Sequence, residues 1–324
     1  MRIKPRLAIF AVVLLLSSVQ AASAASIFVS NERDDTVTVL DSATLKIVKA
    51  IPVGKRPRGI VITPDFKEVL VCAGDDDRID VIDADKLQVS RHLESGADPE
   101  LLDVDPKGER VYIANEDDAL VTIMDLKSGA VLAQVPVGVE PEGMRVSADS
   151  RVTVVTSEST SMAHFVDNAS FKVVANVLVD TRPRYAEWTH NGSQVWVSSE
   201  VGGTVAIIDA ASYRVLRKIG FPVPGVRREL VEPVGIRFSK DGGLAFIALG
   251  PANRVAVVDT KTFEVLRYIV VGQRPWHMEL DPDGSRLYVA NGLTNDVVVI
   301  DVATLRPLTS SPVGRLPWGI AIKP

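Results

Sequence analysis

The stretch Arg274–Asp301, RPWHMELDPDGSRLYVANGLTNDVVVID, holds three short runs rich in Val, Ile, Leu and aromatic residues. The turn sequence Asp281-Pro-Asp-Gly284 separates the first two runs, and the polar loop Asn291–Asp296 separates the second from the third. Aspartate, proline and glycine each favour backbone bends, for different physical reasons. Short apolar runs divided by such turns predict β-strands.

The same arrangement recurs along the chain. An aspartate ends a β-rich run seven times and a proline opens another run seven times, both at intervals of 42 residues with one exception of 50. The positions are Asp41, Asp83, Asp125, Asp167, Asp209, Asp259 and Asp301, and Pro57, Pro99, Pro141, Pro183, Pro233, Pro275 and Pro317. A period near 42 predicts four-stranded propeller blades. Each aspartate is expected to begin a turn by accepting backbone N–H groups two residues on.

The two ends of the repeat array predict how the fold closes. The first unit lacks its first strand and begins with Ile27–Ser30, whereas the chain ends on an unpaired first strand, Gly319–Ile322. Pairing these two segments removes open sheet edges. The sequence therefore predicts one all-β domain over residues 25–324, a seven-bladed β-propeller of four-stranded blades whose C-terminal innermost strand pairs with the N-terminal strands.

Residues 1–24 have the pattern of a secretory signal peptide. Arg2, Lys4 and Arg6 precede the apolar run Leu7–Leu16, and Ala22-Ser-Ala24 supplies small residues for cleavage. Cleavage is expected after Ala24 and the mature chain in the periplasm, with no membrane span after cleavage. A retained anchor is the alternative.

Charge and cysteine content exclude several kinds of site. Loss of three basic and no acidic residues with the signal changes the formal net charge from −5 to −8, which disfavours nucleic acid and favours a cation or a basic protein surface. Cys72 is alone, so no internal disulfide and no CxxCH haem site is expected. It falls in a column of small residues and is expected to be buried. His92, His164 and His190 do not converge, which disfavours a multi-histidine metal site.

The strand after each repeated proline is expected to line the central channel, with apolar third and fifth positions packing between blades. The fourth position alternates in charge over five blades and predicts a belt of ion pairs with a structural role. Its members are Val61, Asp103, Arg145, Glu187, Arg237, Glu279 and Ala321.

The first two positions after the proline differ most between blades. The first position reads Arg58, Glu100, Glu142, Arg184, Val234, Trp276 and Trp318, and the second reads Gly59, Leu101, Gly143, Tyr185, Gly235, His277 and Gly319. Aromatic rings and arginines on one arc suit a flat anion, because rings stack and guanidinium groups pair carboxylates. The candidate ligand-binding residues are Arg58, Glu100, Glu142, Arg184, Trp276, His277 and Trp318. The alternative is that these side chains only plug the channel.

The 50-residue interval places an insertion at Phe221–Pro233, on the face of the candidate site. Its residues Arg227, Arg228 and Glu229 are candidates for a lid or a partner-binding loop, because long loops on rigid scaffolds often carry function. A tolerated surface insertion is the alternative. Acidic loops at 34–35, 75–77 and 117–118 lie on the same face and match no EF-hand, so no metal site is assigned.

The units resemble the YVTN family of β-propellers, on the segments Arg286-Leu-Tyr-Val-Ala-Asn291, Val297-Val-Val-Ile-Asp301 and Val271-Gly-Gln-Arg-Pro275. More narrowly, the chain resembles the periplasmic propeller proteins associated with PQQ-dependent alcohol catabolism. That resemblance implies an accessory role beside quinoprotein dehydrogenases. The dehydrogenases themselves usually have eight blades, a tryptophan-docking repeat and vicinal cysteines, so this chain is not expected to be one of them.

Three hypotheses follow. The first is a non-catalytic binding protein that holds a small anion, with PQQ as a candidate ligand, or docks a redox protein such as a quinoprotein dehydrogenase or a cytochrome c. The second is a lactonase-like hydrolase in which His277 is the general base, assisted by Glu100 or Glu142. The third is a docking platform whose acidic loops bind a basic protein. The sequence leaves catalysis open and assigns no catalytic residue.

Overall fold

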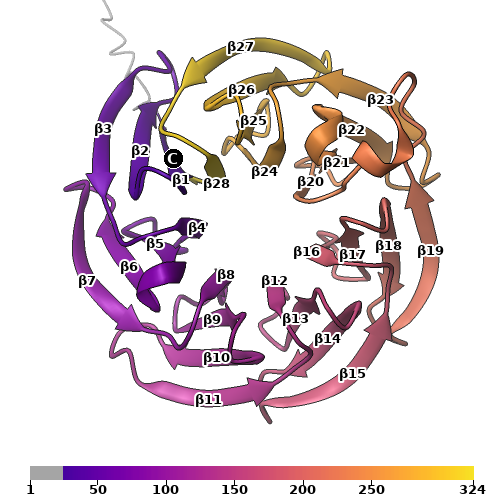
Figure 1. Ribbon diagram of the computed structural model, residues 1–324. Helices are drawn as coiled ribbons and strands as arrows, with labels where there is room; N and C mark the ends of the chain where they lie inside the picture. Colours follow the sequence, from indigo (N-terminus) through magenta and orange to yellow (C-terminus); the bar gives the residue numbers. More distant parts are fainter. Residues whose placement is uncertain (1–24) are drawn as a thin grey trace, which may run out of the picture.

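The computed structural model describes residues 25–324, so the predicted signal peptide, residues 1–24, lies outside the described residues. Seven four-stranded antiparallel sheets surround a central axis as the blades of a propeller, as Figure 1 shows. The predicted fold class and blade number are therefore confirmed. Within the described part of the chain, no helix has the length and apolar character needed to cross a membrane.

The elements follow one order from the axis outward in every blade. The innermost strands are β4 (Pro57–Ile62), β8 (Pro99–Val104), β12 (Pro141–Val146), β16 (Pro183–Trp188), β20 (Ile236–Phe238), β24 (Pro275–Leu280) and β28 (Pro317–Lys323). The second strands are β1 (Ser26–Asn31), β5 (Glu68–Ala73), β9 (Arg110–Asn115), β13 (Val152–Ser157), β17 (Gln194–Ser199), β21 (Leu244–Ala248) and β25 (Arg286–Asn291). The third strands are β2 (Thr36–Asp41), β6 (Arg78–Asp83), β10 (Leu120–Asp125), β14 (Met162–Asp167), β18 (Thr204–Asp209), β22 (Arg254–Asp259) and β26 (Asp296–Asp301). The outer strands are β3 (Ile47–Pro52), β7 (Gln88–Glu94), β11 (Val131–Pro136), β15 (Lys172–Leu178), β19 (Arg214–Gly220), β23 (Val265–Val270) and β27 (Arg306–Pro312). Three short 3-10 turns complete the set: η1 (Gly74–Asp76), η2 (Arg228–Leu230) and η3 (Gly250–Ala252).

The repeated aspartates begin turns as expected. Asp41 accepts hydrogen bonds from the backbone N–H groups of Ala43 and Thr44, and Asp259 accepts them from Lys261 and Thr262. Such bonds favour the charged carboxylate and therefore lower its pKa. Each turn fixes the connection from a third to a fourth strand.

The ring closes through the strands at the two ends of the described chain. In the first blade β28 pairs with β1 in antiparallel register, Ile27 opposite Ile322 and Val29 opposite Ile320. All four side chains are buried in one apolar cluster. The predicted closure is therefore confirmed, and both ends of the domain depend on it.

The innermost strands approach one another closely near the axis, and the second position after each proline reflects this. Glycine and larger residues alternate there over most of the ring. A Cβ atom on Gly143 would lie 2.8 Å from the Cα of Tyr185, and one on Gly235 would lie 3.0 Å from the Cα of His277. Each of these glycines therefore makes room for a larger residue on the next blade. The register of β12 and β24 also shifts just after the proline, so strict side-chain alternation does not hold there.

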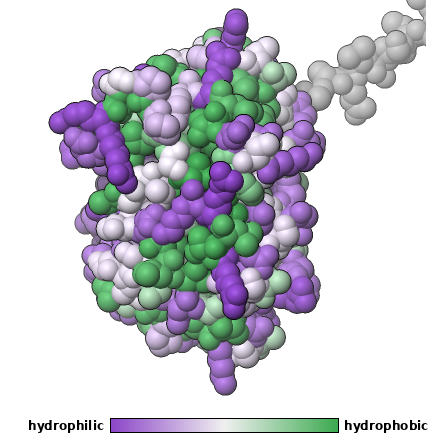
Figure 2. Space-filling model, turned by 90° about the vertical axis from the view of Figure 1, so that its right-hand side faces the viewer, coloured by the Kyte–Doolittle hydropathy of each residue, from purple (hydrophilic) through white to green (hydrophobic). Residues whose placement is uncertain are grey.

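The outer strands carry scattered apolar side chains. Leu216 on β19, and Leu266 and Val270 on β23, are more than half exposed. Figure 2, turned toward the side of these strands, shows apolar and polar side chains interleaved over this part of the surface. Single exposed apolar residues are common on soluble proteins. The mixed surface of the outer strands in this view therefore does not indicate a binding site.

The first prediction concerns closure. Ile320→Asp should lower the free energy of unfolding by about 3 kcal/mol or more, because a charge would be buried and the apolar contacts of Ile320 lost. Leu308→Asp on outer strand β27, where the side chain is 55% exposed, should change it by about 0.5 kcal/mol or less. Urea unfolding of both variants measures this. Equal losses would contradict a role for β28 in holding the ring.

Candidate functional site

The channel has two ends. The upper mouth is bordered by the loops that follow the second and fourth strands, and the lower mouth by the turns between first and second strands. The predicted belt lies toward the lower mouth. Arg145 Nε is 2.9 Å from Glu187 Oε1, and Arg237 Nε is 3.0 Å from Glu279 Oε2. Further pairs join Arg237 to Glu187 at 2.8 Å and Arg145 to Asp103 at 3.5 Å. The alternating column is therefore a continuous chain of ion pairs over five blades.

The upper mouth holds two further networks of charged side chains. The first spans blades with β1, β5 and β9. Arg58 lies 2.8 Å from Glu100 and 3.3 Å from Glu32, and Arg56 lies 2.7 Å from Glu100 and 2.7 Å from Asp75. Glu100 is fully buried. Burial raises the pKa of Glu100, but Arg58 and Arg56 outweigh it and hold that pKa below its ordinary value.

The second network centres on Arg184, which is 5% exposed. Its guanidinium group lies 2.7 Å from Glu142 and 3.6 Å from Glu200, and it also contacts Glu158. Arg182 adds contacts to Glu158 at 2.8 Å and Glu200 at 3.1 Å. Burial raises the pKa of the Glu142 carboxyl well above its ordinary value despite Arg184, and the Glu158 carboxyl beside it contributes to that rise. The Glu142 carboxyl therefore takes up a proton more readily than an ordinary glutamate.

Aromatic rings fill the axis between the upper networks and the belt. The His277 ring lies between Trp318, at 4.1 Å, and Tyr185, at 5.0 Å between ring centroids. Trp276 lies 6.2 Å from Trp318 and carries the Arg274 guanidinium 4.3 Å from its centroid. Burial, together with the charges of Arg237 and Arg184, holds the pKa of His277 well below its ordinary value. His277 is therefore neutral at pH 7.

The structure places the four charged ligand-binding candidates in the upper networks and the three aromatic ones in the layer beneath them, but it pairs the charged ones with each other or with neighbouring glutamates. Trp318 is 1% exposed and His277 is 6% exposed, so both act as packing residues of the channel in this structure. Within residues 25–324, His277 makes no hydrogen bond to Glu100 or Glu142. The geometry therefore gives no support to the general-base role considered for His277.

Four carboxylates of the upper mouth were missed in the sequence. Glu32, Glu116, Glu158 and Glu200 follow the second strands of four blades, and their spacings are multiples of 42. The repeat period could therefore have identified these glutamates, but the sequence analysis considered only the aspartates of the same loops. It also did not compare the residues that precede the repeated prolines, which include Arg56, Arg182 and Arg274.

Glu116 has a raised pKa within this group of carboxyl groups. Burial raises its pKa to about 7, with further contributions from the neighbouring carboxyl of Glu100 and the charge of Glu158. Carboxylate oxygens of Asp98, Glu100 and Glu116 lie within 4.8 Å of one another, a spacing that could hold a cation. Arg56 already pairs with both Asp98 and Glu100, so much of this negative charge is compensated.

The other three histidines and the single cysteine each have local contacts. His92 contacts Asp80, His164 accepts the N–H of Gly138, and His190 contacts the carbonyl of Ser239, so the three histidines do not converge. Cys72 is buried, and burial raises the pKa of its thiol.

The insertion between β19 and β20 is anchored by apolar side chains and exposes charged ones. Phe221, Val223 and Val231 are buried in the largest apolar cluster. Arg227 and Glu229 lie 3.4 Å apart at its exposed tip, beside Arg228 in η2. This places the charged residues at the surface of the upper face. Whether they act as a lid or a partner loop stays a prediction.

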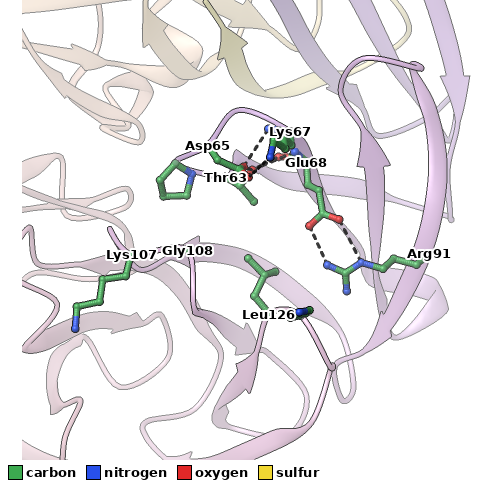
Figure 3. A pocket seen from close by; sticks show the side chains of 10 residues that line it. Thr63, Asp65, Lys67, Glu68, Arg91, Lys107, Gly108 and Leu126 are labelled. Atoms are coloured by element: carbon green, nitrogen blue, oxygen red, sulfur yellow. Dashed lines mark hydrogen bonds and ion pairs between the residues drawn. The ribbon is translucent and has the colours of Figure 1, made fainter.

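Several cavities open on the lower face. One of about 430 Å³ opens at the lower mouth beneath the belt, and a second of about 300 Å³ shares Arg145, Arg237 and Glu279 with it. A third, of about 360 Å³, lies between neighbouring blades, where Glu68 points to Arg91 (Figure 3). None of these three is lined by the seven predicted ligand-binding residues.

Comparisons with known proteins support the fold. The model of the choice-of-anchor I domain matches residues 117–285, just over half of the chain, and that of the YNCE-like beta-propeller matches residues 6–115. A comparison with curated proteins finds no match.

Solved structures resemble the chain at low sequence identity. Hydrazine synthase of Kuenenia stuttgartiensis is 21% identical with a TM-score of 0.78, covering 86% of this chain and 92% of its own. A functionally unknown protein from Desulfotomaculum acetoxidans DSM 771 is 15% identical with a TM-score of 0.80, covering 92% and 98%. The dihydro-heme d1 dehydrogenase NirN in complex with DHE is 16% identical with a TM-score of 0.68, covering 94% and 76%. At these identities the likeness establishes the fold alone.

The second prediction concerns pH. The folded-state pKa of Glu116, about 7, exceeds its ordinary value of 4.5, so its proton stabilises the folded protein fully below about pH 4.5. That stabilisation is lost as the pH rises through 7. The unfolding free energy of Glu116→Gln minus that of the wild type should therefore increase as the pH is raised from 5 to 8. Unfolding measurements on both proteins at each pH give this difference. Glu109→Gln, an exposed control, should show no such trend.

The third prediction concerns the buried arginine. Arg184→Met leaves Glu142 and Glu158 without their main counter-charge and should lower the free energy of unfolding by about 3–5 kcal/mol. Arg214→Met, at an exposed position on β19, should cost about 0.5 kcal/mol or less. Urea unfolding at pH 7 measures both. A loss below about 1 kcal/mol for Arg184→Met would mean that its carboxylate partners are already neutral.

Proposed function

The chain belongs to the choice-of-anchor I domain family, and we propose that it is a non-catalytic propeller that docks a basic redox protein on its acidic upper face. The partner is a cytochrome c or a quinoprotein dehydrogenase, which this protein binds in the periplasm. The role as an accessory to PQQ-dependent alcohol catabolism rests on the resemblance of the repeats to those periplasmic propellers. The name of one similar solved structure, a dihydro-heme d1 dehydrogenase, also favours a redox setting.

One observation carries this proposal, the surplus of carboxylates around the upper mouth. Ten carboxyl groups face five guanidinium groups there. They are Glu32, Asp75, Asp98, Glu100, Glu116, Glu140, Glu142, Glu158, Glu200 and Glu232, against Arg56, Arg58, Arg182, Arg184 and Arg274. Protonation of Glu116 and Glu142 reduces the surplus but does not remove it. A field of one sign steers partners of the opposite charge.

Exposed apolar side chains on the same face suit a protein partner. Val139, Val201 and Leu293 lie on loops around the upper mouth and are each more than half exposed. Protein interfaces combine such apolar contacts with a charged rim that sets the rate of association. The acidic loops at 34–35, 75–77 and 117–118 form that rim on three blades, half-buried at 34–35 and mostly exposed in the other two.

A small anionic ligand, with PQQ as the candidate, remains a proposal for the same mouth. The indole N–H of Trp318 is buried without a hydrogen-bond partner among the described residues, so an acceptor atom of a ligand would suit it. Against this, Arg58 and Arg184 already pair with glutamates, and a ligand carboxylate would have to displace them. Docking of a basic protein needs no such rearrangement, so the geometry favours it.

The fourth prediction tests the docking face with a matched pair of variants. Asp117→Lys on the upper face and Asp283→Lys on the lower face change the same charge at exposed positions. With a basic c-type cytochrome as probe, Asp117→Lys should slow association several-fold, because rim charges act on the association rate. Asp283→Lys should change it little. Binding kinetics at a series of salt concentrations measure both.

The salt series also separates docking from ligand binding. Attraction between exposed charges is screened over about 8 Å at 0.15 M ionic strength, so affinity for the cytochrome should fall steeply with salt. Equal effects of the two lysine substitutions, or binding that ignores salt, would contradict docking on the upper face. A titration with PQQ that quenches tryptophan fluorescence, and loses that quenching in Trp276→Phe with Trp318→Phe, would instead support the anionic ligand.

A further inference from the structure

The belt of the lower mouth is incomplete on one side. Five blades contribute long charged side chains to the fourth position, whereas two adjacent blades contribute Val61 and Ala321. The charged side chains reach one another and pair from blade to blade. The small pair does not extend this chain across the opposite arc. The cavity of about 430 Å³ lies at this gap and includes both small residues in its lining.

The walls of this cavity differ in polarity across the channel. On the side of β28 and β4 the wall is aliphatic: Ile62 is half-buried there, and Ile60, Ile320 and Ile322 reach it with the small exposed part of side chains that otherwise pack in the apolar clusters. On the other side it is formed by the charged members of the belt, among them Arg145 and Arg237. Its volume falls in the range of small-molecule sites, about 300–1,000 Å³, which are mostly apolar with a few placed polar groups.

The unused hydrogen-bonding groups that we identify in the charged wall are N–H donors of the two arginines. A guanidinium group has five N–H donors. Arg145 uses Nε and Nη1, and Arg237 uses Nε and Nη1, to bind carboxylates, the Tyr185 hydroxyl and a backbone carbonyl. In residues 25–324, no hydrogen bond is made by Nη2 of either arginine.

The carboxylates of the belt already accept hydrogen bonds; Asp103 and Glu279 line this cavity, and Glu187 lies between the two arginines. Asp103 accepts the N–H groups of Val104 and Val146 besides contacting Arg145. Glu187 and Glu279 each accept a backbone N–H as well as an arginine. An incoming group would therefore meet two unused guanidinium nitrogens, whereas every carboxylate oxygen of the belt already accepts at least one hydrogen bond. The belt as a whole has three carboxylates and two arginines, so a further negative charge would be disfavoured.

We propose that the lower mouth binds an uncharged, largely aliphatic molecule that ends in a carbonyl oxygen. The carbonyl accepts hydrogen bonds from Nη2 of Arg145 and Arg237, and the aliphatic part packs on the four isoleucines of β4 and β28. This site is independent of the docking face, since the aromatic rings of Tyr185, His277 and Trp318 lie between the two mouths.

Two other lower-face cavities fit a ligand less well. The cavity in Figure 3 has its main charged groups, Glu68 and Arg91, paired with each other at 2.9 Å. A cavity of about 580 Å³ lined by Trp188 and Tyr213 has aspartates, Asp167 and Asp209, that are used to cap turns. Lys67, Lys107 and Lys127 also line the first of these cavities, but their side chains are exposed at its turns and are not held by a network like that of Arg145 and Arg237.

The experiment uses residues 25–324 with isoleucine methyl groups labelled with ¹³C and octan-2-one as the probe. Saturable shifts are expected at Ile60, Ile62, Ile320 and Ile322, with Ile79 and Ile113, buried in other contacts, unchanged. Octane, which lacks the acceptor, should bind about tenfold more weakly, because the hydrogen bonds to charged donors are lost.

Two variants make the result specific. Ala321→Phe fills the gap and should weaken binding at least tenfold, while unchanged methyl shifts of Ile79 and Ile113 report an intact fold. Arg145→Lys keeps the charge but removes the forked donor, and should weaken octan-2-one several-fold without changing octane. If Ala321→Phe does not fold, the comparison of octane with octan-2-one and the Arg145→Lys variant still test the proposal. Equal binding of octane and octan-2-one, tighter binding of octanoate, or shifts at other isoleucines would each overturn the proposal.

Discussion

The crowding of seven innermost strands around one axis constrains the rest of this structure. At the level of the second position after the proline, backbones of neighbouring blades approach so closely that Gly143 and Gly235 have no room for a Cβ atom. Each glycine is followed by a larger residue on the next blade, Tyr185 or His277. Those larger side chains then meet at the axis. The Trp–His pair of the seventh blade is therefore first a consequence of packing, whatever further role Trp276 and Trp318 have.

Charges on either side of the aromatic layer are arranged differently. In the belt, carboxylates and guanidiniums alternate around the ring, so each charge has a partner on the next blade and the desolvation of one is offset by the other. At the upper mouth the arginines cluster in two groups, and glutamates from two loops per blade crowd around them. The surplus there is accommodated by carboxyl groups with raised pKa, Glu116 and Glu142. The same repeat thus gives a lower end whose charges are paired from blade to blade and an upper end crowded with carboxylates.

Most of the fold could be predicted from the sequence because the repeat period reports it directly. The spacing of the residues equivalent to Asp41 and Pro57 predicts the number of blades. The belt could be predicted from one repeat position, Asp103 to Glu279, at which the charge alternates between neighbouring blades. The upper mouth could not be predicted as well, because its contacts join different columns. Arg58 was expected to be free for a ligand, yet it pairs with Glu100 from the next blade and Glu32 from a loop. Comparing columns one at a time does not reveal such pairs. The cavity at Val61 and Ala321 was missed because the belt was interpreted through its charged members, while the gap comes from its small ones.

The neutral state of His277 has a consequence for how the two ends of the channel affect each other. Arg237 lies below the aromatic layer and contacts Tyr185, whereas Arg184 lies above it, 5.5 Å from the Trp276 ring. Both arginines disfavour a proton on His277, and burial disfavours it further. The layer therefore carries no charge at neutral pH and has no titratable group that a partner on either side can easily ionise. Binding at one mouth can reach the other only by moving these rings or the arginines that hold them, and the glycines packed against the neighbouring strands leave little space for such movement.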